Sequence, residues 1–125
     1  MDKIQPEISI VIPTYNAEST LENAVSSVIG QSFENWELII ADDASSDGTV
    51  RLARELVSRD GRIRVVESEV NKGVAEMRNY GVSLSRGQYV AFLDSDDTWH
   101  PDKLSIQLGR MRDTDASLCY TSYAL

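Results

Sequence analysis

The stretch YVAFLDSDDTWHPDKL, Tyr89 to Leu104, changes abruptly from apolar to acidic residues. A short apolar run of this kind is typical of a strand that is buried on both faces of a sheet. The run ends in Asp94, Ser95, Asp96 and Asp97, and three carboxylates within four residues repel one another when all are ionised. The stretch therefore predicts a buried strand whose end carries negative charge that a partner must offset.

Apolar and alternating patterns elsewhere predict a regular succession of strands and helices. Strands are predicted at Ile8–Pro13, Trp36–Ala41, Arg62–Glu67, residues 89–93 and Ala116–Leu125. A first helix is predicted from a Ser19/Glu22 capping box to Gly30, and a second at Thr49–Arg59 after an Asp47 N-cap. A third helix is predicted at Val74–Ser85, with Val74, Met77 and Leu84 inward. A fourth follows Pro101, with Leu104, Leu108 and Met111 inward. This order implies one α/β, Rossmann-like domain over residues 1–125, with a mostly parallel sheet and helices on both faces.

The composition excludes several classes of protein. The net charge of -8, without a Lys/Arg cluster, argues against binding to nucleic acid or to anionic membranes. The longest apolar runs are too short to span a bilayer, and the first residues lack the apolar core of a signal peptide. Cys119 is the single cysteine, so it cannot form an internal disulfide and is expected in the core. These features predict a protein of the cytoplasm or of the cytosolic face of a membrane.

Polar clusters follow three of the predicted strands. In an open α/β sheet, ligands bind beyond the carboxyl ends of the strands, and parallel strands share one such edge. PTYN follows the first strand, DDASSD the second and DSDD the fourth. The sequence therefore gathers one set of side chains around a single crevice: Tyr15, Asn16, Asp42, Asp43, Asp94, Asp96 and Asp97.

Carboxylates that crowd together indicate a cation. All-oxygen ligands suit Mg²⁺ or Mn²⁺, whereas a lone histidine, His100, makes a zinc site implausible. Asp94 and Asp96 are two residues apart and point the same way on an extended chain, so one can reach a ligand hydroxyl while the other holds a metal. The alternative is that these aspartates form a turn. For Asp97, an N-cap or supporting role stands beside direct ligation of the metal.

The loops before the second and third helices leave further alternatives. Asp42 and Asp43 face opposite sides, so only one of them is expected in the crevice. Tyr15 either packs under a loop or stacks on a flat ring. Gly73 precedes a helix whose free N–H groups could meet a phosphate, and Arg78 pairs either with a phosphate or with a carboxylate at the edge of the core.

Several motifs together resemble a known family. ISIVIPTYN and IIADDASSDGT, then NKGVAEMRN, then GQYVAFLDSDDTWHPDKL, are similar in order and spacing to the N-terminal half of family 2 glycosyltransferases of the GT-A fold. The resemblance implies transfer of a sugar from a nucleoside diphosphate donor to an acceptor, with inversion and with Mg²⁺ or Mn²⁺. It also implies a glycan or lipid-linked acceptor in polysaccharide or cell-envelope synthesis, and a UDP-sugar as the expected donor.

The resemblance assigns roles to the residues that match the first two motifs. Pro13, Tyr15 and Asn16 fall in the first nucleotide-binding loop, where the aromatic ring lies against the base. Asp43 matches the carboxylate that hydrogen-bonds the base. Arg78, within NKGVAEMRN, is predicted to belong to the nucleotide-sugar site through a phosphate contact.

The resemblance also assigns the acidic cluster. Asp94, Ser95 and Asp96 match the family's Asp-x-Asp, in which the first Asp contacts the ribose and the second ligates the metal that bridges the diphosphate. Asp97 matches a frequent extra acid. The carboxylates would thus hold a cation against a diphosphate leaving group, where it neutralises developing charge.

Three further expectations concern the general base, an alternative phosphatase function and self-association. The general base is expected beyond Leu125, so the catalytic residue is unknown and the chain represents the donor-binding half, or alternatively a non-catalytic nucleotide-binding module. DSDDT also fits the nucleophile motif of haloacid-dehalogenase-like phosphatases, although that motif normally follows a first strand. A sheet that ends at its fifth strand leaves an edge open, which predicts self-association.

Overall fold

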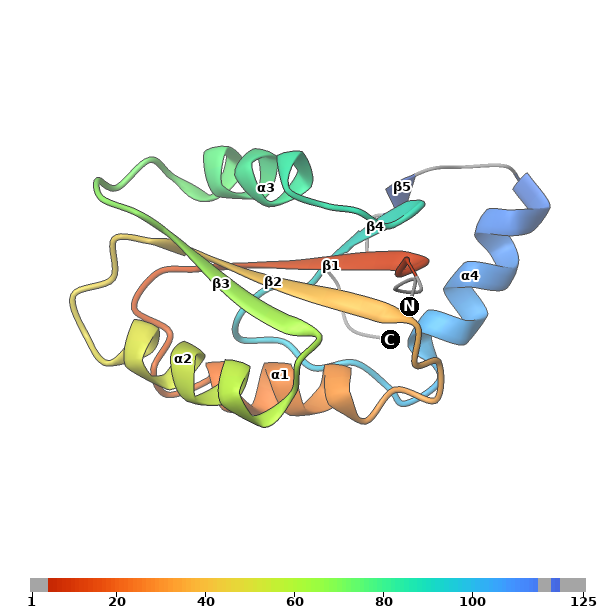
Figure 1. Ribbon diagram of the computed structural model, residues 1–125, viewed down its shortest axis with the longest axis horizontal. Coiled ribbons are helices and arrows are strands. Elements are labelled where there is room, and N and C mark those ends of the chain that lie inside the picture. The colour runs from red at the N-terminus through yellow and green to blue at the C-terminus, as the bar shows by residue number, and fades with distance from the viewer. Residues whose placement is uncertain (1–4, 115–117, 120–125) are drawn as a thin grey trace.

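The computed structural model describes residues 5–114 and 118–119, which form a five-stranded sheet flanked by helices (Figure 1). The strands are β1 (Ile8–Thr14), β2 (Trp36–Asp43), β3 (Ile63–Ser68), β4 (Tyr89–Phe92) and β5 (Leu118–Cys119). The helices are α1 (Leu21–Ile29), α2 (Thr49–Arg59), α3 (Val74–Ser83) and α4 (Lys103–Thr114). The predicted alternation of strands and helices is confirmed.

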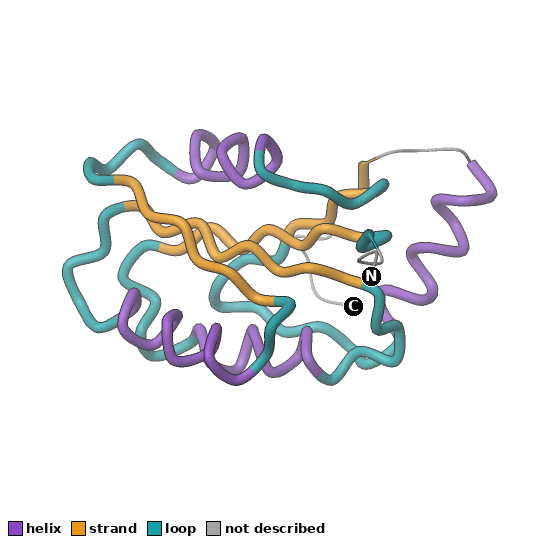
Figure 2. Tube along the Cα trace, in the orientation of Figure 1, coloured by secondary structure: helices purple, strands orange, loops and turns teal. Residues whose placement is uncertain are grey.

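The strand order places the predicted site at a change of direction. The described strands pair in the order β3-β2-β1-β4-β5, and each of these pairings is parallel. The chain moves outward from β1 to β3 and then returns to the other side of β1, so β1 and β4 flank the switch point at which such sheets bind ligands. The loops that follow β1, β2 and β3 lie together at the left of the sheet (Figure 2).

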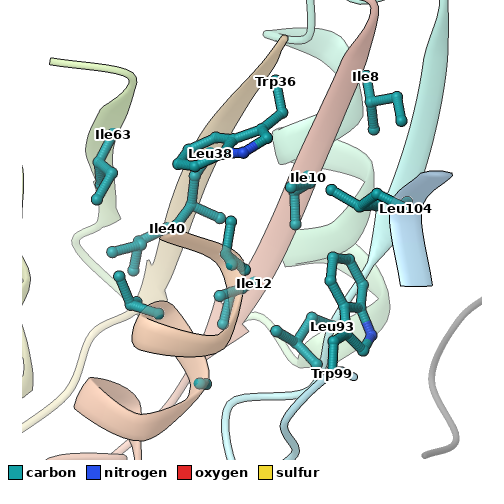
Figure 3. Packing of buried hydrophobic residues seen from close by; sticks show 14 of the residues in the cluster. Ile8, Ile10, Ile12, Trp36, Leu38, Ile40, Ile63, Leu93, Trp99 and Leu104 are labelled. Carbon is teal, nitrogen blue, oxygen red and sulfur yellow. The ribbon is translucent and has the colours of Figure 1, made fainter. Parts of the chain in front are cut away.

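Helices cover both faces of the sheet, as predicted. α1 and α2 lie on one face and α3 on the other, while α4 lies toward the end at which the strands begin (Figure 1). Alternate residues of a strand point to opposite faces, so Ile8, Ile10 and Ile12 enter one core (Figure 3). The same core takes further large members from β2, α1, the segment after β4 and α4: Trp36, Leu38, Ile40, Leu21, Val25, Val28, Leu93, Trp99 and Leu104.

The second face depends on a close approach of α3 to the sheet. A Cβ atom at Gly81 would lie 2.4 Å from Cγ1 of Val11, so the helix rests directly on β1 only because position 81 has no side chain. Met77, one turn earlier, is fully buried on the same helix. This packing fixes the beginning of α3, which borders the site.

Two predicted helix caps differ from the structure. α1 begins at Leu21 after Thr20, and no side-chain cap forms, so the Ser19/Glu22 capping box is wrong. The neighbouring carboxylate of Glu18 instead accepts the N–H of Gly48 at 3.0 Å and joins the two loops. For α2 the cap residue is Gly48 rather than Asp47, although Asp47 still accepts the N–H of Thr49 at 3.0 Å. Contacts between the loops have displaced the local capping patterns.

Element lengths and inward faces differ in a few places. β2 continues to Asp43, two residues beyond its predicted end. Val74 is 54% exposed rather than inward, because it is the first residue of α3 and projects beside the site. Leu104 and Leu108 are buried as predicted, while the side chain of Met111 and most of the predicted strand Ala116–Leu125 lie outside the described residues.

Candidate active site

A pocket of about 440 Å³ lies at the carboxyl ends of β1, β2 and β4. Seven of the predicted site residues line it: Pro13, Tyr15, Asn16, Asp43, Asp94, Ser95 and Asp96. Its wall also contains Ala17, Ser19, Thr20 and, from α3, Val74 and Met77. Three loops that are far apart in the sequence thus enclose one space, as the parallel sheet requires.

Asp42 and Asp43 occupy opposite sides of β2, which confirms that only one of them faces the pocket. The buried carboxylate of Asp42 accepts a hydrogen bond from the hydroxyl of Thr14 at 2.7 Å. It also accepts the N–H of Ser45 at 2.9 Å and the Ser45 hydroxyl at 2.6 Å. Asp42 is therefore absent from the pocket wall and instead ties the loop after β2 to the end of β1.

Asp43 faces the pocket and also organises the loop before α3. Its two carboxylate oxygens accept the backbone N–H groups of Lys72 at 2.6 Å and Gly73 at 2.9 Å, while its carbonyl accepts the Asn71 amide at 3.2 Å. Gly73 has φ of 95°, in the left-handed region that favours glycine. The N–H of Gly73 thus meets a carboxylate of the protein, and the phosphate proposed for the free N–H groups of α3 stays a prediction.

Tyr15 and Asn16 form the first loop of the pocket. The Tyr15 side chain is 55% exposed, so it is not packed under a loop and its ring is accessible. Asn16 adopts a positive φ of 49°, donates its N–H to the Ser45 hydroxyl at 2.9 Å and accepts the N–H of Ser46 at 2.8 Å. The hydroxyl of Ser45 joins Asn16 to Asp42 and so links two pocket loops.

The acidic residues after β4 converge. Carboxylate oxygens of Asp94, Asp96 and Asp97 all lie within 4.8 Å of one another. Burial raises the pKa of the Asp97 carboxyl above its usual value, and the charges of Asp96 and Asp94 raise it further. Asp97 does not cap a helix, because α4 begins only at Lys103. Three clustered oxygen donors with unfavourable mutual charge fit a hard divalent cation such as Mg²⁺ or Mn²⁺.

Arg78 lies beside the cluster rather than in the pocket wall. Its guanidinium pairs with Asp94 at 3.0 Å and lies 5.7 Å from the centre of the Phe92 ring. Of the two predicted partners, the structure therefore shows the carboxylate at the edge of the core. This ion pair holds the carboxylate of Asp94, a residue that lines the pocket.

The structure also bears on membrane association. Among the helices of residues 5–114, none is long and apolar enough to cross a bilayer.

Curated proteins that are similar to the chain are named as glycosyltransferases. The chain is 43% identical over 125 residues to the putative teichuronic acid biosynthesis glycosyltransferase TuaG of Bacillus subtilis, covering all of this chain and 50% of TuaG. It is 41% identical over 118 residues to the UDP-Glc:alpha-D-GlcNAc-diphosphoundecaprenol beta-1,3-glucosyltransferase WfgD of Escherichia coli, covering 94% of this chain and 46% of WfgD. The chain thus spans about half the length of the curated relatives it matches.

Solved structures agree with these relatives. The crystal structure of S. aureus TarS 1-349 in complex with UDP-GlcNAc superposes with a TM-score of 0.80 at 26% identity, over 86% of this chain and 31% of the TarS 1-349 chain. The mannosyltransferase PcManGT of Pyrobaculum calidifontis, at 24% identity and a TM-score of 0.80, has the same fold over 86% of this chain and 33% of its own. The phosphatase alternative finds no support among these proteins. Residues 9–124 match the family described as Glycosyl transferase family 2, and the chain belongs to that family.

Proposed function

We propose that this chain is the donor-binding part of an inverting, metal-dependent glycosyltransferase that uses a UDP-sugar. The observation that carries the proposal is one shared pocket, in which an accessible aromatic ring, a carboxylate of β2 and two acids of the cluster, Asp94 and Asp96, face the same space. A pocket of about 440 Å³ falls within the range of small-molecule sites. The donor's nucleotide would lie across the switch point between β1 and β4.

Four of the side chains that line the pocket have proposed roles. The Tyr15 ring stacks on the base, and Asp43 accepts a hydrogen bond from it with a lone pair that its two backbone donors leave available. Asp94, held by Arg78, accepts a hydrogen bond from the ribose. Asp96, with Asp97 beside it, holds Mg²⁺ or Mn²⁺. When bound, the cation neutralises charge on the diphosphate leaving group.

The relatives support a uridine donor and a cell-envelope acceptor. TarS has been solved with UDP-GlcNAc, and the name of WfgD states a UDP-Glc donor and a diphosphoundecaprenol-linked acceptor. TuaG is named for teichuronic acid biosynthesis. We extend the donor class to this chain and propose a glycan or lipid-linked acceptor for the whole protein.

Calorimetric titration tests the proposal. UDP, GDP and UMP are each titrated into the chain in Mn²⁺ and again in a chelator. We expect UDP to bind more tightly than GDP, and Mn²⁺ to strengthen the binding of UDP by about tenfold while leaving UMP nearly unchanged, because a cation bridge needs the second phosphate. Equal affinity for UDP with and without Mn²⁺ would refute the metal assignment, and equal affinity for UDP and GDP would refute the assignment of the base.

A further inference from the structure

The segment between the acidic cluster and α4 is anchored on the end of α1. Gln31, which follows α1, is 4% exposed, and its amide lies against residues that follow the cluster in the sequence. Its Nε2 donates to the carbonyl of His100 at 2.7 Å and to that of Ser27 at 3.0 Å. Its Oε1 accepts the N–H of Leu104 at 3.0 Å. A buried side chain of α1's end thus connects to a segment 69–73 residues away.

Gln31 satisfies a backbone N–H group at the start of α4 that has no partner within the helix. Leu104 lies in the first turn of α4, where backbone N–H groups have no partner within the helix. The Gln31 oxygen therefore acts as a helix cap supplied from another part of the chain. The same amide holds the His100 carbonyl, so the turn and the helix start are fixed by one side chain.

Neighbouring contacts make this anchor rigid. Ser32 donates its N–H to the carbonyl of Pro101 at 2.9 Å and its hydroxyl to Asp102 at 2.9 Å. Trp99 is 6% exposed and packs in the main core (Figure 3). The chain is thus held firmly from position 99 onward, two residues after the last acid of the cluster.

The acidic cluster therefore lies between two fixed points. On one side, the N–H of Leu93 donates to the carbonyl of Val11 at 3.1 Å and attaches the cluster to β1. On the other side is the anchor at Trp99 and Gln31. Between these points the N–H of Asp97 closes a turn on the carbonyl of Asp94 at 3.0 Å. A shift of the second anchor would change the separation of the carboxylates while leaving the base-binding loops in place.

We propose that Gln31 is a positioning residue for the acidic cluster: by fixing the His100–Leu104 segment it holds the carboxylates of Asp96 and Asp97 in a geometry ready for a divalent cation. The inference deepens the proposed function and rests on its metal assignment. A preorganised site binds its ligand more tightly because less order is lost on binding. Gln31 would then contribute to the part of nucleotide affinity that depends on metal, and not to the remainder.

The test compares two substitutions with a matched control. Gln31→Met keeps the approximate volume and removes every hydrogen bond of the amide. Gln31→Glu keeps the acceptor for Leu104 and removes both donors. Ser9→Ala, the control, removes a buried hydroxyl that bonds Glu37 at 2.5 Å at the opposite end of the sheet. Unfolding in urea is measured for each variant, so that loss of stability is known separately from loss of binding.

The first readout is the gain in UDP affinity that Mn²⁺ provides. We expect Gln31→Met and Gln31→Glu each to reduce this gain by about fivefold to tenfold, and UDP affinity in chelator to change by less than about twofold in each. Ser9→Ala should keep the full gain even where its loss of stability is equal. The proposal is overturned if Gln31→Met keeps the full gain in UDP affinity from Mn²⁺, or if Ser9→Ala loses as much of that gain as Gln31→Met does.

The second readout needs neither metal nor nucleotide. Amide hydrogen exchange of residues 96–100 should accelerate in Gln31→Met by about tenfold relative to the native chain, and not in Ser9→Ala. Unchanged exchange overturns the proposal. If native UDP binding shows no gain from Mn²⁺, the metal assignment fails, and the exchange measurement alone decides whether Gln31 positions the segment. If Gln31→Met does not fold, Gln31→Glu provides both readouts.

Discussion

The two ends of the sheet hold buried or half-buried carboxylates in opposite circumstances. Where the strands begin, Glu37 is 3% exposed and is surrounded by donors: the Ser9 hydroxyl at 2.5 Å, the Arg86 backbone at 2.7 Å and the Arg64 guanidinium at 3.5 Å. Burial alone would raise the pKa of Glu37, but the hydrogen bonds from Ser9 and Arg86 and the charge of Arg64 outweigh it and lower that pKa.

Where the strands end, the balance is reversed. Asp97 is only partly buried, yet burial and the charges of Asp96 and Asp94 raise its pKa. Arg78 pairs with one member of the cluster and leaves three carboxylates within 4.8 Å of one another. The contrast separates two kinds of acid. Glu37 has partners that belong to the fold and stabilises the fold, whereas the cluster repels itself and is the site that we propose for a cation.

The largest expected effect is at the structural end. Glu37→Ala leaves the hydroxyl of Ser9 and the N–H of Arg86 without their acceptor, so we expect the free energy of unfolding to fall by about 2–3 kcal/mol. Urea unfolding measures this loss. Glu55→Ala, which removes an exposed glutamate from α2, should change stability by less than about 0.5 kcal/mol. A small effect of Glu37→Ala would show that burial of this carboxylate is no better compensated than burial of Asp97, and would remove the contrast.

Asp43 combines both uses, and its replacement should weaken nucleotide binding most. Asp43→Ala removes the acceptor proposed for the base and releases the N–H groups of Lys72 and Gly73 that hold the loop before α3. We expect UDP affinity to fall by about tenfold to a hundredfold, equally in Mn²⁺ and in chelator, with less discrimination against GDP. Asp43→Asn, which keeps one acceptor oxygen, should lose less. An effect confined to the Mn²⁺ titration would contradict the role at the base.

Asp96 should show the complementary pattern. Asp96→Ala is expected to abolish the roughly tenfold gain in UDP affinity from Mn²⁺. UDP affinity in chelator should stay constant or rise, because a negative charge near the diphosphate is gone. Glu69→Ala removes one exposed acid that does not line the pocket and controls for net charge. If Asp96→Ala keeps the full gain, the cluster is a turn and the metal assignment fails.

Much of this arrangement could be predicted from the sequence, because periodicity reports which face of an element is buried. Alternation along β2 correctly separated Asp42 from Asp43, and the helical pattern located α2 at its observed bounds. The shared edge of a parallel sheet then brought the polar clusters together. These are consequences of backbone geometry, which local sequence determines.

Side-chain partners across long distances could not be predicted in the same way. Gln31 meets His100 across 69 residues, and Arg86 meets Glu37 across 49. Neither contact leaves a periodic signal, since a polar residue at a helix end or on a strand is equally compatible with solvent. The capping box failed for a related reason: Glu18 meets Gly48 of the next loop, and α1 starts without a side-chain cap. Tertiary hydrogen bonds outweighed local capping preferences.

The smallest expected effect is also the most direct test of the contrast, because the two acids should respond to pH with opposite signs. The pKa of Glu37 is lowered in the folded chain, so its stabilisation is present above the ordinary glutamate pKa and is lost as pH falls through the folded value. The pKa of Asp97 is raised in the folded chain. Ionised Asp97 therefore opposes folding, and stability falls as pH rises from the ordinary aspartate pKa through the folded value.

Urea unfolding of Asp97→Asn and Glu37→Gln across acid and neutral pH measures both responses. We expect Asp97→Asn to be more stable than the native chain at neutral pH by about 0.5 kcal/mol, a modest figure because solvent screens a partly exposed cluster. As pH falls, the gain in stability of Asp97→Asn over the native chain should shrink. The loss of stability of Glu37→Gln should shrink as well, so the two differences approach zero from opposite signs. In the proposed metal assignment Mn²⁺ is the partner of the cluster, so saturating Mn²⁺ should cancel or reverse the advantage of Asp97→Asn and leave Glu37→Gln unaffected. An Asp97→Asn variant that is less stable at neutral pH without metal would show that Asp97, like Glu37, already has its partners within the fold.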